Sequence, residues 1–132
     1  MSEVVVRSRL ATLALLAAII ASGLLLRHFG PSAGMPLVVV KYGGSLLWGT
    51  MVYVLMALVA SRRPATLLAI LAGLIAVAVE LSRLYHTPSL DAFRLTTAGA
   101  LLLGRVFSPW NMVAYGLGIL LGYWADVIAT KR

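Results

Sequence analysis

The stretch VAVELSRLYHTPSLDAFRLTTAGALLLGRVFSPWN, residues 77–111, holds most of the side chains that we expect to be capable of chemistry in this largely apolar chain. Its first carboxylate, Glu80, follows fifteen residues, 65–79, that carry no charge. An ionised group in such surroundings is costly unless a cation or hydrogen-bond donors compensate it. We therefore expect this stretch to form a polar pocket at one face of a small membrane bundle.

The composition of the rest of the chain is that of a membrane protein. Of its 132 residues, 61% are hydrophobic and 11% are charged, whereas a soluble domain is about half apolar and a quarter charged. The absence of cysteine excludes disulfides and thiolate metal sites. The net charge of +7 comes from basic residues scattered between apolar runs, so the pattern indicates membrane topology and predicts no nucleic-acid partner.

Four apolar segments are long enough to cross a bilayer, and they predict an all-α membrane protein with a single transmembrane domain. The predicted spans are residues 10–26, 37–60, 65–84 and 110–129. The shortest run, residues 10–26, is about 25 Å long as a helix at ~1.5 Å per residue, enough for most of a bilayer core. We expect it to be an anchored span rather than a cleaved signal peptide, because it continues past the small residues 21–23.

The segment between the third and fourth spans is shorter. Residues 95–104 are apolar but would reach only about 15 Å as a helix, too little to cross. We expect a short helix over about residues 90–104 that lies in the membrane interface or re-enters the membrane.

An even number of spans places both termini on one side of the membrane. Six basic residues fall on that side, namely Arg7, Arg9, Arg62, Arg63, Lys131 and Arg132. The loops on the other side contain Arg27, Arg94 and Arg105. The positive-inside rule therefore predicts that both termini are cytoplasmic and that residues 77–111 face outward.

This topology brings polar residues from distant parts of the chain to the outer side. The expected ligand-binding residues are Lys41, Glu80, Arg83, Asp91, Arg94, Arg105 and Asn111. Two carboxylate–arginine pairs in this set are three residues apart and share a helical face. The set has four cations and two carboxylates, a surplus of two positive charges that suits a phosphate or carboxylate ligand.

Each of these residues also has a purely structural explanation. Lys41 can extend to the interface, and the three arginines can anchor helix ends at lipid phosphates. Glu80 can serve only as a salt-bridge partner of Lys41 or Arg83. His28 and His86 match no metal-ligand spacing, and no nucleophile or phosphate-loop motif occurs. The sequence therefore predicts no metal, no cofactor and no catalytic residue.

Gly118 and Gly122 form a GxxxG pattern in the last span. Small residues at this spacing let helices approach closely in lipid, where packing drives their association. We therefore expect these glycines to pack against another helix. That helix belongs either to this chain or to a second copy or partner membrane protein.

Several blocks of sequence together resemble one family. In order, they are KYGG (41–44) with LW (47–48), VELSRLY (79–85), LDAFR (90–94), LGRVF (103–107), and Ala114-Tyr115 with Gly118. This order resembles the small bacterial inner-membrane proteins catalogued as domain of unknown function 2809, over nearly the whole chain. Arg83 stands where many members have Gln, and Asn111 where they often have Asp. The resemblance implies a multi-pass protein of the bacterial inner membrane and no particular activity.

A weaker resemblance links the chain to VanZ-type membrane proteins. The tail pattern of those proteins falls on Arg105, Ser108, Asn111, Tyr115, Gly118 and Gly122, with Glu80 upstream. Ser108 and Asn111 replace the two carboxylates of the pattern. An activity that depends on this acidic pair is therefore not expected here.

Three functions remain open on the sequence. The first is binding of an anionic lipid headgroup or envelope precursor, with membrane lipid as the partner. The second is a structural or accessory subunit in a homo-oligomer or larger membrane complex. The third is a VanZ-like envelope enzyme or resistance factor with Glu80 or Asp91 as general base. It has the least support, because two carboxylates without a nucleophile or metal site define no reaction.

Overall fold

The computed structural model describes residues 7–102 and 109–130, which form a bundle of helices. Its four long helices are α1 (Arg9–Phe29), α2 (Leu37–Val59), α3 (Ala65–Ser82) and α6 (Pro109–Thr130). Two short helices, α4 (Pro88–Arg94) and α5 (Thr97–Leu102), come between α3 and α6. Each long helix is long and apolar enough to cross a membrane. The predicted all-α membrane bundle with four spans is confirmed.

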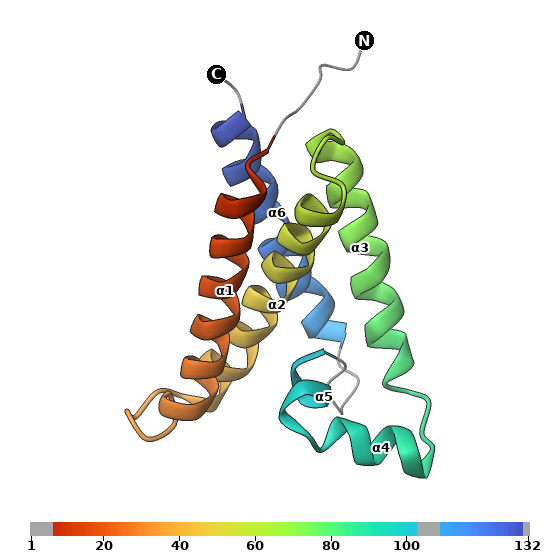
Figure 1. The fold of residues 1–132 in the computed structure, drawn as a ribbon. Helices are drawn as coiled ribbons and strands as arrows, with labels where there is room; N and C mark the ends of the chain where they lie inside the picture. Colours follow the sequence, from red (N-terminus) through yellow and green to blue (C-terminus); the bar gives the residue numbers. More distant parts are fainter. Residues whose placement is uncertain (1–6, 103–108, 131–132) are drawn as a thin grey trace.

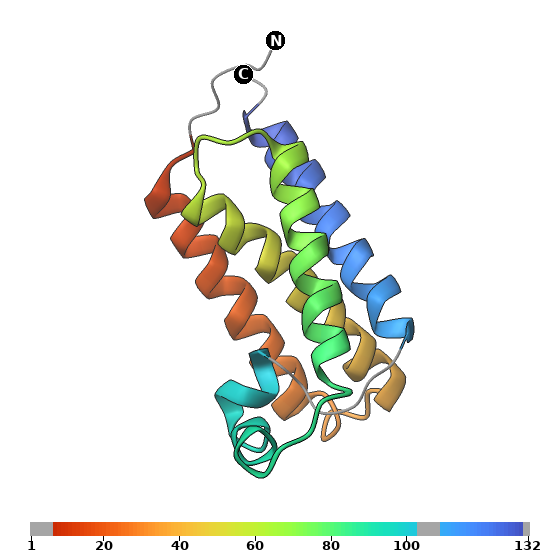
Figure 2. The ribbon, with the colours of Figure 1, turned by 90° about the vertical axis from the view of Figure 1, so that its right-hand side faces the viewer.

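The long helices alternate in direction along the bundle (Figure 1). The start of α1, the connection between α2 and α3, and the end of α6 lie together at one end, which we call the terminal end. The connection between α1 and α2 lies at the opposite end with α4 and α5, as both views show (Figures 1 and 2). We call this second end the α4–α5 end.

Local sequence signals explain where the helices begin. The side chain of Ser8 accepts a hydrogen bond from the first turn of α1, and that of Thr87 does the same for α4. Pro36 and Pro64 stand immediately before α2 and α3. Proline lacks the backbone N–H that a helix interior needs, so it is tolerated at a helix start but not inside one.

Helix α2 is the centre of the bundle. It packs against α1, α3 and α6, and α3 also packs against α6. Where α2 meets α6, a Cβ atom on Gly118 would collide with the carbonyl oxygen of Leu46, and one on Gly122 would lie 3.0 Å from the ring of Tyr53. The two glycines therefore pack against a helix of the same chain. The hydroxyl of Thr50 adds a hydrogen bond of 2.8 Å to the carbonyl of Gly118.

The segment expected as one short helix over about residues 90–104 contains two helices in its described part. Helix α4 begins at Pro88, and the chain bends after Arg94 before α5 begins at Thr97. The bend is explained by Thr96, whose hydroxyl donates to the carbonyl of Phe93 at 2.6 Å and accepts from the N–H of Gly99 at 3.0 Å. A threonine that bonds to the backbone on both sides ends one helix and caps the next. Residues 103 and 104 lie outside the described part of the chain.

Candidate functional site

A cleft of about 450 Å³ lies toward the α4–α5 end of the bundle. Helices α1 and α3 flank α2 in Figure 2, and side chains of α1 and α2 form most of the cleft wall. Arg83, which follows α3, and Tyr115 of α6 complete it. The cleft is therefore built from residues that are far apart in the sequence.

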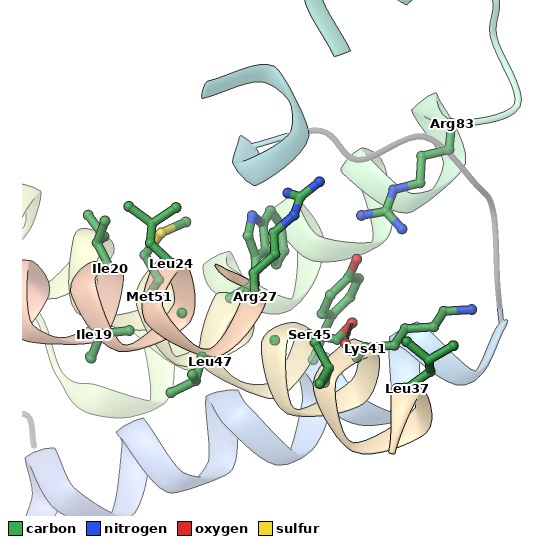
Figure 3. A pocket seen from close by; sticks show the side chains of 15 residues that line it. Ile19, Ile20, Leu24, Arg27, Leu37, Lys41, Ser45, Leu47, Met51 and Arg83 are labelled. Carbon is green, nitrogen blue, oxygen red and sulfur yellow. Dashed lines mark hydrogen bonds between the residues drawn. The ribbon is translucent and has the colours of Figure 1, made fainter. Parts of the chain in front are cut away.

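The cleft is apolar at one end and cationic at the other (Figure 3). The apolar end is formed by Ile19, Ile20, Leu24, Leu47 and Met51. At the cationic end the guanidinium groups of Arg27 and Arg83 point toward each other, and Lys41 extends from α2. Of the described residues that line the cleft, these three are cations and none is a carboxylate.

Arg27 and Lys41 are the accessible cations of the cleft. Both are exposed, and neither forms a salt bridge with a carboxylate of the described residues. Arg27 lies in the last turn of α1, where the helix dipole favours a positive charge. The ammonium nitrogen of Lys41 lies 5.2 Å from the centre of the Tyr42 ring, within the range of a cation–π contact.

Arg83 is held at the cleft by a buried carboxylate. Glu80 is completely buried, because it continues the inward face of α3 formed by Leu68, Ala72 and Ala76 at intervals of four residues. Its Oε1 lies 3.1 Å from a guanidinium nitrogen of Arg83 and accepts a hydrogen bond of 3.0 Å from the hydroxyl of Tyr115. The structure therefore pairs Glu80 with Arg83, one of the two cations considered for it.

Two aromatic residues in contact with each other also line the cleft. The Tyr115 ring lies 4.7 Å from the Trp48 ring and 6.0 Å from the guanidinium carbon of Arg83. Trp48 lines the cleft and is only 8% exposed, and its indole nitrogen has no hydrogen-bond partner among the described residues. Because an indole N–H can only donate, this nitrogen is a buried donor that no described acceptor uses.

The predicted residues Asp91 and Arg94 lie in a separate cluster outside the cleft. Arg94 is 1% exposed and donates to the carbonyls of Ser82 at 2.6 Å and Tyr85 at 2.8 Å. It thereby supplies donors to the last carbonyl of α3, which also accepts from the N–H of Tyr85, and to a carbonyl of the loop that follows. Arg94 also donates to Asp91 at 3.2 Å within α4, and its hydrogen bonds to Ser82 and Tyr85 fasten α4 to the end of α3.

The carboxyl of Asp91 has a second partner on the surface. Its Oδ1 lies 3.0 Å from Nδ1 of His86. The hydrogen bond with His86 and, to a smaller extent, that with Arg94 lower the pKa of Asp91 below its ordinary value. The ionised carboxylate is therefore the form that this cluster stabilises.

Asn111 and Arg105 complete the predicted set. Asn111 is buried at the start of α6, and its Oδ1 accepts a hydrogen bond of 3.1 Å from the hydroxyl of Ser45, which lines the cleft. It thus supports the cleft wall from behind. Arg105 lies outside the described residues, as does Ser108 of the VanZ-type pattern.

A known family matches the part of the chain in which most of these residues lie. The family described as "Protein of unknown function (DUF2809)" matches residues 35–119, more than half of the chain. The chain belongs to the DUF2809 family. The matched region includes Lys41, Trp48, Glu80, Arg83 and Tyr115, whereas α1 with Arg27 precedes it. Neither a curated protein nor a solved structure matches this chain significantly.

This DUF2809 protein has a second buried ion pair, at the terminal end. The guanidinium group of Arg7 donates from two nitrogens to the two carboxylate oxygens of Asp126, each at 2.6 Å. The hydroxyl of Tyr53 donates to the same carboxylate at 2.5 Å, and Arg7 also donates to the carbonyls of Ser61 and Arg63. We call Arg7, Tyr53 and Asp126 the terminal cluster.

Sequence reasoning missed the terminal cluster, although one signal for it was present. Asp126 is a carboxylate within the apolar run of the fourth span, so the argument that singled out Glu80 applies to it equally. Arg7 was interpreted only as a topology charge. Arg27, too, was counted only as a loop charge, because nothing in its local sequence indicates that α1 closes one side of the cleft.

Proposed function

We propose that this protein binds an anionic amphiphile of the membrane in the cleft. The anionic group would lie between Arg27, Lys41 and Arg83, and the hydrocarbon along the apolar end. The observation that carries the proposal is the division of the cleft into a cationic end and an apolar end, with no carboxylate among its described lining residues. Arginine and lysine bind phosphate and carboxylate groups by charge-assisted hydrogen bonds.

The length of the apolar wall favours an amphiphile over a small soluble anion. Ile19 and Arg27 are eight residues apart in α1, so the wall between them is about 12 Å long at ~1.5 Å per residue. A hydrocarbon chain bound there buries apolar surface that a small anion would leave uncovered. In this arrangement Glu80 and Tyr115 act as positioning residues that hold Arg83 at the cleft.

The proposal includes an orientation in the bacterial inner membrane. Arg9, Arg62 and Arg63 are exposed at the terminal end, whereas Arg7 there is neutralised by Asp126. The exposed arginines support cytoplasmic termini by the positive-inside rule. The cleft then faces the outer leaflet, and a membrane lipid enters it from the side.

No specific observation favours the other two functions. An accessory subunit was expected to dock a partner through Gly118 and Gly122, but both glycines pack against α2. An envelope enzyme would use Glu80 or Asp91 as its base. Glu80 is bound to Arg83 and Tyr115, and Asp91 to His86 and Arg94.

The test measures lipid retained by the purified protein. The full chain is purified in a non-ionic detergent with added phosphatidylglycerol, and bound lipid is counted by native mass spectrometry. We expect the double variant Arg27→Gln, Lys41→Gln to weaken retention at least about tenfold, equivalent to about 1.4 kcal/mol. The matched control Arg9→Gln, Arg62→Gln removes the same charge at the terminal end and should retain lipid like the wild type. Equal retention by both double variants would contradict the proposal.

A further inference from the structure

The net charge around the cleft gives information about the ligand. Arg27, Lys41 and Arg83 contribute three positive charges, and Glu80, paired with Arg83, contributes one negative charge. The described groups at the cationic end therefore carry a net charge of +2. A single negative charge placed between them would leave half of this charge uncompensated.

Phosphate groups differ in the charge that they can supply. A phosphodiester carries one negative charge, whereas a phosphate monoester carries about −1.5 to −2 at pH 7. Uncompensated charge is costly where water is partly excluded. The monoester therefore matches the charge of this cleft, and the diester does not.

The hydrogen-bond donors indicate the same class of ligand. A phosphate monoester presents three strong acceptor oxygens, one more than the two unesterified oxygens of a diester. The cleft is lined by the guanidinium groups of Arg27 and Arg83 and the ammonium group of Lys41, and by Trp48, whose buried indole N–H has no partner among the described residues. A monoester can present one unesterified oxygen to each of the three cations, whereas a diester has only two such oxygens.

We infer that the cleft selects amphiphiles that end in a phosphate monoester over those whose phosphate is a diester. This inference rests on the proposed function and adds selectivity to it. The polar group lies among the cations and the indole N–H, and the hydrocarbon lies along Ile19, Leu24 and Met51.

The experiment compares three probes on the full-length protein in a non-ionic detergent. Phosphatidic acid and phosphatidylglycerol with identical acyl chains differ by one glycerol group, which makes the phosphate of phosphatidylglycerol a diester. Glycerol 3-phosphate carries the monoester without hydrocarbon. We expect phosphatidic acid to bind at least about tenfold more tightly than phosphatidylglycerol, and glycerol 3-phosphate to bind more weakly than phosphatidic acid.

Each other outcome overturns a different statement. Equal affinity for the two lipids overturns the selectivity and leaves the proposed function standing. If neither lipid binds, both fail. If glycerol 3-phosphate binds as tightly as phosphatidic acid, the cleft is a site for soluble phosphate esters, and the proposal that its ligand is an amphiphile is wrong.

Two variants test the physical basis of the selectivity. Lys41→Gln removes one positive charge from the cationic end, and the single negative charge of a diester then balances what remains. The preference for phosphatidic acid should therefore fall to about twofold or less. Trp48→Phe keeps an aromatic ring but removes the N–H. It should weaken the binding of phosphatidic acid about threefold or more relative to the binding of phosphatidylglycerol. The control Arg9→Gln should keep the full preference. An unchanged preference in both Lys41→Gln and Trp48→Phe would contradict the inference.

Discussion

The charged side chains at the two ends of the bundle are paired to different extents. In the terminal cluster, the guanidinium group of Arg7 meets both oxygens of Asp126 and two backbone carbonyls. In the cleft, Arg83 has the carboxylate of Glu80, but Arg27 and Lys41 have no carboxylate partner among the described residues. The first arrangement is complete within the chain, and the second has cationic groups that can still bind an anion.

This difference separates a structural role from a binding role for the same residue type. A buried arginine that is bound to a carboxylate and to backbone carbonyls of its own chain fixes segments relative to one another, as Arg7 and Arg94 do. Cations beside a cleft without a neighbouring carboxylate are available to a ligand. Counting the acceptors around each cation therefore indicates function better than its position in the sequence does.

The largest expected effect comes from breaking the terminal cluster. Arg7→Ala leaves the carboxylate of Asp126 buried without its cation, and loss of one partner of a buried ion pair costs about 3 kcal/mol or more. The free energy of unfolding, measured in detergent with a chemical denaturant, should fall by about that amount. Replacing both partners, as Arg7→Met with Asp126→Leu, should recover much of the loss. A similar loss in the control Arg9→Ala, whose side chain is exposed, would show that the ion pair is not responsible.

A smaller loss of stability is expected at the close contact between α2 and α6. Gly118→Ala places a methyl group against the carbonyl oxygen of Leu46, which is backbone and cannot move aside easily. We expect the free energy of unfolding to fall by about 2 kcal/mol, within the range for overpacked sites. Gly116→Ala is the matched control in α6, because nothing lies within 4 Å of its added Cβ. Equal melting temperatures for the two variants would contradict the close α2–α6 packing.

Loss of the Glu80 carboxylate, which holds Arg83 at the cleft, should have a different effect from loss of an ion-pair partner in the terminal cluster. Glu80→Gln removes the charge beside Arg83 but keeps an acceptor for the Tyr115 hydroxyl, so we expect a loss of about 1.5 kcal/mol, as for a hydrogen bond to a charged group. A bound anion can replace the lost charge here. Phosphatidic acid should therefore raise the melting temperature of Glu80→Gln by more than it raises that of Arg7→Ala. Equal shifts in both variants would remove the proposed difference between the two ends.

The smallest effect is expected at the surface cluster of Asp91. Its pKa is lowered below the ordinary value of 3.8 on folding, mainly by the hydrogen bond with His86. A carboxyl group with a lowered folded-state pKa stabilises the protein above its unfolded-state pKa, and this contribution is lost as the pH falls through the folded-state value. The difference in melting temperature between wild type and Asp91→Asn should therefore be present at pH 7 and shrink as the pH falls below about 3.8. A constant difference from pH 7 to pH 3 would contradict the assignment.

The helices were predictable from the sequence because the bilayer sets their length. Each long helix begins and ends within a few residues of the corresponding predicted span. The charge-free run before Glu80 correctly indicated a carboxylate with a compensating partner. The break between α4 and α5 was not predicted, because it depends on side-chain hydrogen bonds of Thr96 with backbone groups on both sides.

The partners of the charged residues were harder to predict than the helices. Arg7 and Asp126 are 119 residues apart, so no local pattern connects them. Arg94 was expected to face a ligand, but it is bound to backbone carbonyls of Ser82 and Tyr85, and carbonyls are present at every position of a sequence. Arg27 joins the cleft only because α1 packs beside α2.

Among the described helices, α1 packs mainly against a single neighbour, α2. Arg7, just before its start, is bound to Asp126, whereas its other end leads into a turn at Gly34, which has a positive φ of 86°. An outward swing of α1 about its fastened end would separate one helix interface only. This wall is therefore the side on which the bundle can widen at least cost to admit a bulky molecule.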